Sequence, residues 1–274
     1  MDIRLIAFDL DGTLLRSDKT ISPRTMRALH AAAQRGVLLV PATGRLYRAL
    51  PETLTDASLF SRMILVNGAQ IYDNVAGVTL AREELTPEQA RRMLAHLGTL
   101  NVVRGIYLDG QGYMSRRDFD TLDQIALSPA AAAVMRRTYL PAEDLDELAG
   151  RAPSVQKLMA FFRHLPDRLP AIRSTTERFQ EYAVSSSIAN NIEINARNAT
   201  KGAALGTLCR LLGLELSQCM AFGDDTNDCS MLRAAGLGVA MENAAPEVRA
   251  CADTVTESCD DDGVARMIER VLEL

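Results

Sequence analysis

Tryptophan is absent from the 274-residue sequence, and aromatic residues make up only 5% of it. Aliphatic side chains must therefore fill most of any core. No stretch approaches the roughly 20 apolar residues that a membrane-spanning helix needs. The N-terminal Met1-Asp2-Ile3-Arg4 also lacks the pattern of a secretory signal. We therefore expect a cytoplasmic protein that does not enter a membrane.

The five cysteines contain no C-x-x-C pair, and all of them fall in the last third of the sequence: Cys209, Cys219, Cys229, Cys251 and Cys259. An odd number without the spacing of a metal site argues against zinc and against a disulfide framework. We expect reduced, mostly buried thiols.

Lysine is also scarce, because only Lys19, Lys157 and Lys201 are found among 30 basic residues. The formal net charge is -5 at pH 7, so the chain lacks the basic footprint of a nucleic-acid-binding protein. The hydrophobic fraction of 47% and the charged fraction of 24% are those of an ordinary soluble globular protein.

Strands and helices alternate in residues 1–82 and again in the C-terminal part of the chain, which predicts a Rossmann-like, doubly wound parallel sheet. The predicted strands of this α/β core are 3–8, 37–40, 63–66, 219–222 and 237–240. The predicted helices are 23–34, 46–54, 201–212, 227–235 and 262–272. We assign the discontinuous core to residues 1–82 and 190–274.

Residues 83–189 follow a different, α+β pattern, which predicts a cap domain inserted into the core. Thr86-Pro87-Glu88-Gln89 is a helix-start signature. Asp109-Gly110 separates two alternating segments and predicts a hairpin. A helix at 142–148 and strands at 155–162, 181–184 and 191–195 complete the prediction.

Asp9-Leu10-Asp11-Gly12-Thr13 follows the first predicted strand. Two carboxylates one residue apart, directly after a buried strand, are unfavourable unless a cation or a polar partner offsets their charge. An acidic turn capped by Asp11 explains this short motif equally well when it is taken alone.

Two further motifs have residues that suit a phosphate group. Thr43-Gly44-Arg45 ends the second predicted strand and offers a hydroxyl and backbone N–H groups, although an ordinary turn is the simpler interpretation. Lys201-Gly202 begins a helix, where a lysine opposes the helix dipole unless an anion binds there. The alternative is a lysine exposed to solvent. Because the chain uses arginine almost everywhere else, a lysine at this position favours a specific role over that alternative.

The fourth motif, Gly223-Asp224-Asp225-Thr226-Asn227-Asp228, again places acidic residues between a strand and a helix. Carboxylates are the hard oxygen ligands that Mg²⁺ prefers. A favourable position at the helix N-terminus explains Asp228 alone, but it does not explain three carboxylates. Because the carboxyl ends of parallel strands line one crevice, we expect all four motifs to converge there.

These motifs resemble the haloacid dehalogenase (HAD) superfamily of phosphohydrolases, and in particular its Cof-type subfamily (type IIB). The resemblance covers both portions of the core and continues in residues 66–69, 238–244 and 262–265. Ser258-Cys259 departs from the family pattern, in which an asparagine is frequent before the acidic run. This departure affects a loop contact rather than the chemistry.

The resemblance implies catalysis through an aspartyl-phosphate. Asp9 would be the nucleophile, and Asp11 would protonate the leaving oxygen and then activate water. Thr43 and Lys201 would bind the phosphoryl oxygens.

It also implies Mg²⁺ as the cofactor. The ion would be held by the Asp9 carboxylate, the Asp11 carbonyl and the Asp224 carboxylate. Asp228 would support these ligands, and Asn227 would order the loop.

The cap would select the substrate, which we expect to be a small phosphate ester and preferably a sugar phosphate, since no cap strand is rich in large aromatic residues. Lys157 is the first candidate contact, although a solvent-facing strand position is the simpler explanation for it. Gly44, Arg45 and Asn67 are candidates at the edge of the core.

The same motifs are compatible with other functions. A phosphomutase or phosphotransferase would use the same aspartate, and a phosphatase for flavin mononucleotide or pyridoxal phosphate would use the same core. A non-catalytic, ligand-binding regulator is a further alternative. We expect a monomer or homodimer.

Overall fold

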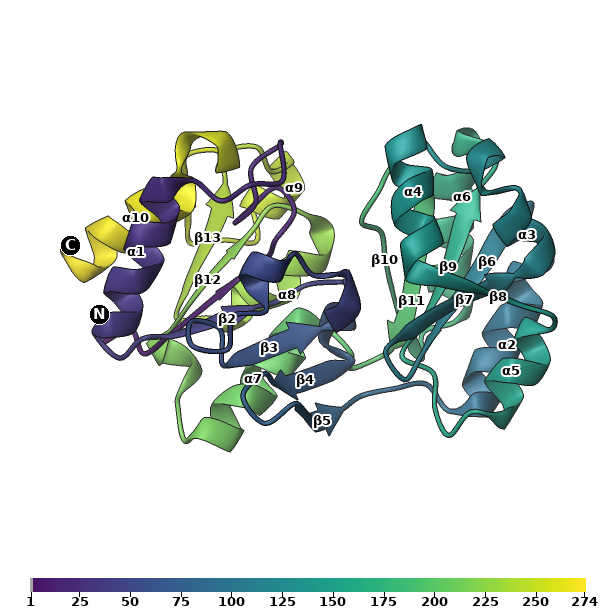
Figure 1. The fold of residues 1–274 in the computed structure, drawn as a ribbon, viewed down its shortest axis with the longest axis horizontal. Helices are drawn as coiled ribbons and strands as arrows, with labels where there is room; N and C mark the ends of the chain where they lie inside the picture. Colours follow the sequence, from purple (N-terminus) through teal and green to yellow (C-terminus); the bar gives the residue numbers. More distant parts are fainter. Residues whose placement is uncertain (1) are drawn as a thin grey trace. The chain divides into compact units, whose positions relative to one another are not determined.

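The computed structural model describes residues 2–274, which divide into two compact units. The first unit comprises the residues up to Gly44, Pro51–Arg82 and Thr200–Leu274, and the second comprises Arg45–Leu50 and Glu83–Ala199 (Figure 1). Among residues 2–274, none of the helices combines the length and the hydropathy of a membrane-spanning segment.

A five-stranded parallel sheet forms the centre of the first unit, in the order β14-β13-β12-β1-β2. Phe8 at the end of β1 pairs with Phe222 of β12 and Pro41 of β2, so these strands end side by side. The strands are β1 (Leu5–Phe8), β2 (Leu38–Pro41), β12 (Cys219–Gly223), β13 (Leu237–Met241) and β14 (Thr254–Thr256).

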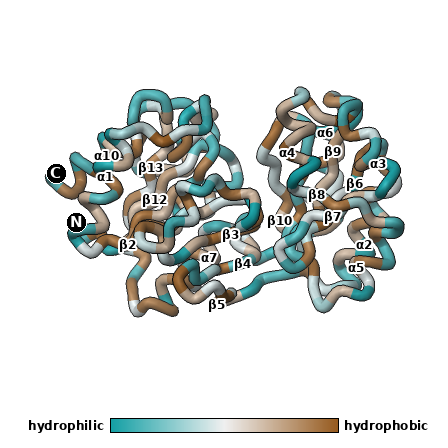
Figure 2. Tube along the Cα trace, viewed as in Figure 1, coloured by the Kyte–Doolittle hydropathy of each residue, from teal (hydrophilic) through white to brown (hydrophobic). Residues whose placement is uncertain are grey.

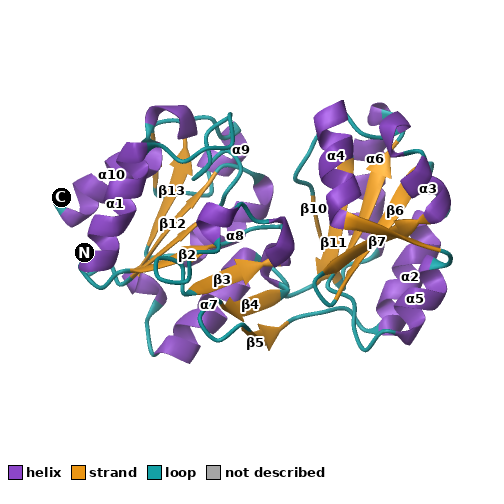
Figure 3. Ribbon diagram, in the orientation of Figure 1, coloured by secondary structure: helices purple, strands orange, loops and turns teal. Residues whose placement is uncertain are grey.

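Helices cover this sheet because its strands are apolar on both faces. Leu5, Ala7 and Ala221 belong to a buried cluster with residues of two of the helices, α7 and α8, while α1 and α10 pack against each other (Figure 3). Figure 2 shows hydrophobic residues along β12. The helices are α1 (Pro23–Gln34), α7 (Lys201–Leu212), α8 (Cys229–Ala234), α9 (Pro246–Arg249) and α10 (Gly263–Leu272).

The predicted strand at 63–66 belongs to a different sheet. β3 (Arg62–Leu65) pairs antiparallel with β4 (Gln70–Asp73), which pairs with β5 (Val78–Arg82). An isolated parallel bridge between Ala42 and Ile64 joins β3 to the end of β2. The predicted strand is therefore present and meets β2 in parallel, but its antiparallel pairing with β4 was not predicted, because β4 and β5 gave no clear signal in the sequence.

The prediction of a helix over 46–54 was also wrong. Residues Tyr47–Ala49 and Glu52–Leu54 form two short 3₁₀ turns, and Pro51 lies between them. A proline lacks the backbone N–H that continues a helix and disfavours helical backbone in the residue before it. Leu50 accordingly is extended, with ψ of 145°.

The second unit contains a six-stranded sheet in the order β10-β11-β9-β6-β7-β8. The predicted hairpin is confirmed: β6 pairs with β7, and Asp109 and Gly110 have φ of 43° and 74° in the turn. The strands are β6 (Val102–Leu108), β7 (Gln111–Ser115), β8 (Tyr139–Ala142), β9 (Lys157–Phe162), β10 (Tyr182–Ser185) and β11 (Asn191–Ala196). The helices are α2 (Pro87–Leu97), α3 (Arg116–Asp120), α4 (Pro129–Thr138), α5 (Leu145–Arg151) and α6 (Arg168–Arg178).

The inserted unit continues beyond the predicted boundary at residue 190. β11 pairs with β9 and β10 of the same sheet, and the first unit resumes at Thr200. The alternating residues of β11 fit a strand of either domain, so strand pairing rather than local pattern sets this boundary.

Two cysteines differ from the prediction of reduced thiols, because a disulfide joins Cys229 to Cys251. Their Cα atoms are 5.3 Å apart, although 22 residues separate them in the sequence, so spacing alone gave no signal. Cys209 and Cys219 are free and buried as expected, and Cys259 is free and half-buried.

Candidate active site

Asp9 lies at the carboxyl end of β1, which is flanked by β12 and β2 in the five-stranded sheet. Its backbone N–H donates to the carbonyl oxygen of Phe222 at 3.1 Å, which continues the pairing of β1 with β12. The side chain is only 11% exposed. The sheet therefore holds this carboxylate in a buried position at its edge.

Lys201 connects two acidic residues that are far from it in the sequence. It is fully buried as the first residue of α7. Its Nζ donates to Asp9 Oδ1 at 2.5 Å and to Asp228 Oδ1 at 2.6 Å. Burial opposes the charge of this amine, but the two carboxylates outweigh it and raise the lysine pKa. The lysine at the helix start therefore faces anionic groups and is not solvated.

Asp228 organises the loop after β12. Its Oδ2 accepts the backbone N–H groups of Asp224 and Asp225 at 3.0 and 3.1 Å. The carboxylate is fully buried, and these two bonds together with Lys201 satisfy it. The last residue of the loop is therefore hydrogen-bonded to the first two, and these bonds hold Asp224 at the end of β12.

Two residues of the first motif that had no assigned role contact Asp224. Thr13 Oγ1 donates to Asp224 Oδ1 at 2.6 Å. Gly12 has φ of +86°, and a Cβ added there would lie 2.3 Å from Asp224 Oδ2. Only glycine suits this backbone and this approach. The sequence offered one signal for Thr13, which was its position within the same short motif.

The three carboxylates Asp9, Asp224 and Asp228 form a cluster in which one oxygen from each lies within 4.8 Å of the others. With Lys201 they carry a formal charge of minus two when all groups are ionised. Burial and the neighbouring carboxylates raise the pKa of Asp9. Burial, with Asp228 and Asp225, raises the pKa of Asp224 to about 7, although the Thr13 hydrogen bond lowers it.

This donor set fits a divalent hard cation. Carboxylate oxygens are the ligands that Mg²⁺ prefers. A double positive charge would also offset the uncompensated negative charge of the cluster, which is unfavourable in a buried site. The cluster thus suits the predicted metal, and an oxygen of Asp228 lies within 4.8 Å of an oxygen of each of the other two carboxylates.

Asp11 is not part of this carboxylate cluster. Its side chain is 40% exposed, and its Oδ1 accepts a hydrogen bond from Lys19 Nζ at 2.9 Å. It nevertheless lies only two residues after Asp9, at the same end of β1. Its carboxylate is therefore accessible to a substrate that reaches this edge.

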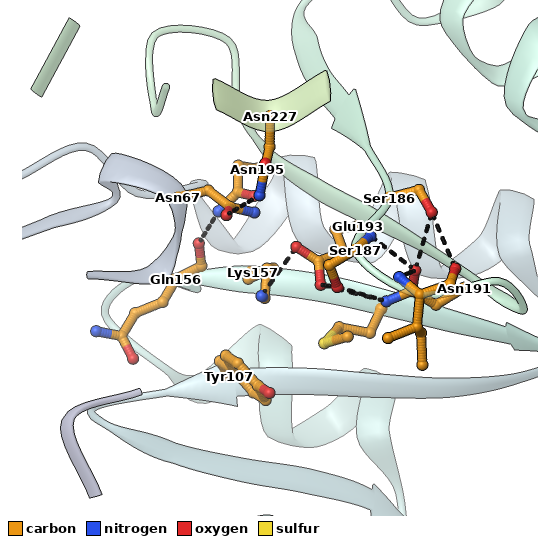
Figure 4. A network of polar contacts seen from close by, with 12 residues as sticks. Asn67, Tyr107, Gln156, Lys157, Ser186, Ser187, Asn191, Glu193, Asn195 and Asn227 are labelled. Atoms are coloured by element: carbon orange, nitrogen blue, oxygen red, sulfur yellow. Dashed lines mark hydrogen bonds and ion pairs between the residues drawn. The ribbon is translucent and has the colours of Figure 1, made fainter. Parts of the chain in front are cut away.

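Thr43, Asn67 and Asn227 form a second group in the first unit. Thr43 follows β2 and is 2% exposed, and its carbonyl oxygen accepts the Asn67 N–H at 3.0 Å. Asn67 has a left-handed backbone with φ of 60°, and its Oδ1 accepts from Asn227 Nδ2 at 3.3 Å (Figure 4). Asn227 Oδ1 is buried and has no hydrogen-bond partner within residues 2–274.

Gly44 and Arg45 fall on the two sides of a division between the units. Gly44 ends the first segment of the first unit, whereas Arg45 belongs to the second unit. Arg45 donates to the carbonyl oxygen of Ala49 at 3.1 Å. The interpretation of Thr43-Gly44-Arg45 as one phosphate-binding loop therefore remains a prediction for Gly44 and Arg45.

Lys157 lies in the second unit and is buried, so a solvent-facing position is excluded. It is 1% exposed and pairs with Glu193 Oε2 at 3.1 Å, and its Nζ lies 4.9 Å from the centre of the Tyr107 ring. Ser187 and Asn191 donate to the other oxygen of Glu193 (Figure 4). Glu193 was not singled out in the sequence, although a charged residue that alternates with buried isoleucines was a signal.

A family model described as haloacid dehalogenase-like hydrolase matches residues 6–268. The HMP-PP phosphatase of Cronobacter sakazakii is 33% identical over 90% of this chain and 87% of its own length. The 5-amino-6-(5-phospho-D-ribitylamino)uracil phosphatase YcsE of Bacillus subtilis is 28% identical over 98% of this chain and 95% of its own.

A solved structure of a haloacid dehalogenase-like hydrolase from B. subtilis has a TM-score of 0.80 with this chain, at 30% sequence identity. The similarity covers 98% of this chain and all of the other. It therefore extends over both units and is not restricted to the parallel sheet.

Proposed function

Because the chain belongs to the haloacid dehalogenase-like hydrolase family, as a Cof-type member and a phosphoric monoester hydrolase, we propose that it is a Mg²⁺-dependent phosphatase. The phosphoryl group of a small ester would be transferred to Asp9 and then to water. The observation that best supports this proposal is the cluster of Asp9, Asp224 and Asp228, in which buried Lys201 pairs with Asp9 and Asp228.

Asp9 is the nucleophile in this mechanism, and its position directly after β1 supports this role. The reaction forms a bond between the Asp9 carboxylate and phosphorus while the ester oxygen leaves. Asp11, two residues away and accessible, gives a proton to that oxygen and later takes one from the attacking water. The ion pair with Lys19 must open for the first of these steps.

Lys201 and Thr43 bind the phosphoryl oxygens, where negative charge must be held in the transition state. Mg²⁺, held by Asp9, Asp224 and the Asp11 carbonyl with Asp228 in support, would screen the repulsion between the Asp9 carboxylate and a dianionic ester. Asn227 orders the loop and offers the buried acceptor Oδ1 to a hydroxyl or amide of the substrate.

For the substrate we propose a sugar phosphate, with Lys157 as the first candidate contact in the cap and Gly44, Arg45 and Asn67 as further candidates. The relatives act on different esters at similar identity, so similarity alone does not select one. Lys157 and Glu193 neutralise each other, and this favours an uncharged, hydroxyl-bearing leaving group over a second anionic group.

The proposal is tested by assaying the purified chain against sugar phosphates, nucleotides, flavin mononucleotide and pyridoxal phosphate, with Mg²⁺ and with a chelator. We expect release of inorganic phosphate that requires Mg²⁺ and is fastest with a sugar phosphate. A preference for flavin mononucleotide or pyridoxal phosphate would contradict the substrate class but not the mechanism.

Free phosphate also separates hydrolysis from transfer. A phosphomutase or phosphotransferase would move the group to a sugar hydroxyl and release little phosphate. A complete lack of Mg²⁺-dependent turnover across the panel would instead support a ligand-binding regulator. A cytoplasmic location and a monomeric or homodimeric state stay predictions.

A further inference from the structure

The disulfide between Cys229 and Cys251 begins one residue after the candidate active site. Cys229 is the first residue of α8 and directly follows Asp228. Asp228 holds the Lys201 ammonium group and two backbone N–H groups of its own loop. A covalent restraint on Cys229 is therefore a restraint on the backbone that positions Asp228.

The other end of the disulfide lies in a different part of the first unit. Cys251 follows α9 and is 8% exposed, and β13 lies between the two cysteines in the sequence. The bond thus fastens the start of α8 to the segment that connects α9 with β14. Nothing else in the chain covalently links the active-site loop to another element within residues 2–274.

Movement of the first turn of α8 also reaches Lys201. The Gly202 N–H donates to Ser230 Oγ at 3.1 Å, and a Cβ added to Gly202 would lie 2.2 Å from the Ser230 carbonyl oxygen. The first turns of α7 and α8 are therefore in direct backbone contact. A shift at Cys229 and Ser230 would displace Lys201 together with Asp228.

Both oxidation states of the pair are compatible with this environment. Cys229 is half-buried, so a small oxidant can reach it. The Glu247 carbonyl oxygen lies 3.2 Å from the Cys251 sulfur, so it would accept a hydrogen bond from this thiol after reduction. The other close pair, Cys209 and Cys219, has its sulfur atoms 3.3 Å apart and buried, and neither residue adjoins the active-site loop.

We propose that Cys229 and Cys251 form a redox switch, in which the disulfide holds Asp228 and Lys201 in the arrangement that binds Mg²⁺ and reduction loosens it. The fold brings Cys229 and Cys251 together, and the position of Cys229 next to Asp228 makes the disulfide a restraint on residues 224–228. The effect on Mg²⁺ and on turnover rests on the proposed function.

The switching reaction consumes one hydroperoxide. The sulfur of Cys229 attacks the peroxide oxygen, the O–O bond breaks, and an alcohol leaves with formation of a sulfenic acid. The sulfur of Cys251 then attacks the sulfur of Cys229, the S–O bond breaks, and water leaves with the thiol proton. Two thiols lose two electrons and two protons in total, and a dithiol reductant reverses the change.

The first test counts thiols in the full-length protein. After treatment with tert-butyl hydroperoxide or with dithiothreitol, alkylation and peptide mass spectrometry should find Cys229 and Cys251 linked in the oxidised sample and alkylated in the reduced one. Cys259 should be alkylated in both samples. Failure of the two cysteines to link after oxidation would overturn the proposal.

The second test measures the Mg²⁺ concentration that gives half of the maximal thermal shift. We expect it to rise by roughly fivefold or more on reduction of the wild type, which is the range of a typical coupling between sites. Hydrogen exchange at residues 224–228 should become faster. Cys229→Ser and Cys251→Ser should behave like the reduced protein in either condition, whereas Cys259→Ser should retain the response.

The proposal of a switch would also be overturned if the disulfide forms but the thermal shift depends on Mg²⁺ concentration equally in both redox states. The wild-type comparison needs no substitution, so a variant that fails to fold does not affect it. If the thermal shifts differ between redox states while no ester is hydrolysed in either, the proposed function fails and the switch stands.

Discussion

At the scale of single residues, the site depends on the buried ammonium group of Lys201. It pairs with two carboxylates, those of Asp9 and Asp228, and leaves the charge of Asp224 uncompensated. Lys201 reaches Asp9 and Asp228 at 2.5 and 2.6 Å, while Asp224 takes its hydrogen bond from Thr13. The lysine fixes the two carboxylates in place but cannot neutralise all three. This deficit of positive charge is the physical reason for expecting a metal.

Asp9→Asn should abolish turnover while the fold remains intact. Asparagine has nearly the same shape but is not a nucleophile, so we expect a loss in kcat on the order of 10⁴-fold or more. The melting temperature in chelator should not fall, because one of three mutually repelling carboxylates is removed. Hydrolysis at the normal rate would show that another residue attacks phosphorus.

Gly12→Ala should weaken Mg²⁺ binding because the added methyl group would collide with Asp224 Oδ2. Gly36→Ala is the matched control: its φ of +79° imposes a similar backbone penalty, but no atom lies within 4 Å of the added carbon. Both variants should lose about 1–2 kcal/mol of stability from the left-handed backbone.

Only Gly12→Ala should lose the stabilisation by Mg²⁺, measured as a thermal shift. An equal thermal shift in the two variants would show that the Gly12–Asp224 approach does not serve the metal.

At the scale of elements, the ends of β1 and β12 crowd acidic groups together, which makes stability depend on pH. Burial raises the pKa of Asp224 from its ordinary value of 3.8 to about 7, so the folded protein keeps a proton that the unfolded chain releases. Where the folded state binds more protons, stability falls as pH rises. Without metal, the free energy of unfolding contributed by Asp224 should therefore decrease from about pH 4 to about pH 7.

Urea unfolding in chelator at pH 5 and pH 8 measures this dependence, and Asp224→Asn should reduce its slope. Added Mg²⁺ should stabilise the protein more at pH 8, since the ligands must be deprotonated. A wild-type slope identical to that of Asp224→Asn would contradict the expectation.

In the cap sheet, the buried pair of Lys157 and Glu193 gives a second prediction. Lys157→Met or Glu193→Gln alone should cost about 3–5 kcal/mol, because each removes the opposite charge that offsets the buried charge of the other residue. The double variant should recover much of that loss in urea unfolding. The exposed pair of Arg151 and Glu147 is the control, and breaking it should change stability by no more than about 1 kcal/mol.

Local pattern predicted the elements that carry their own signals. α1 has the bounds predicted for it, with Ser22 as its N-cap and Pro23 as its first residue, and Asp109-Gly110 marked the cap hairpin. Local pattern did not predict which strands or cysteines pair with each other when they are far apart in the sequence. The order of β3, β4 and β5, the assignment of β11 to the cap sheet and the Cys229–Cys251 bond all depend on which segments meet in space.

The candidate site divides in the same way. Asp9, Asp224 and Asp228 belonged to short motifs after β1 and β12, and the rule that parallel strands end at one edge was enough to bring them together. Lys201 begins α7, which follows β11 of the cap sheet, so this rule does not place the lysine. Glu193 and the contact of Thr13 with Asp224, which lies 211 residues away, had no comparable rule. Such contacts required the structure.

At the scale of the whole molecule, one chain forms a catalytic unit from three separate segments around an inserted unit. The carboxylate cluster and Lys201 come from the first and last segments of this catalytic unit, so neither segment alone can assemble them. The inserted unit has its own sheet and buried polar groups, which lets its sequence change without altering the catalytic edge. Different esters among relatives with a shared core are consistent with that division.

The most direct measurement of the central claim is to identify the residue that carries the phosphoryl group during turnover. The wild type should be mixed with p-nitrophenyl phosphate and Mg²⁺, acid-quenched within one turnover, and treated with borohydride, which reduces an acyl phosphate to an alcohol. Peptide mass spectrometry should then find homoserine at position 9, and none when chelator replaces Mg²⁺. Phosphate release with an unmodified Asp9, or with the reduced residue elsewhere, would contradict the account.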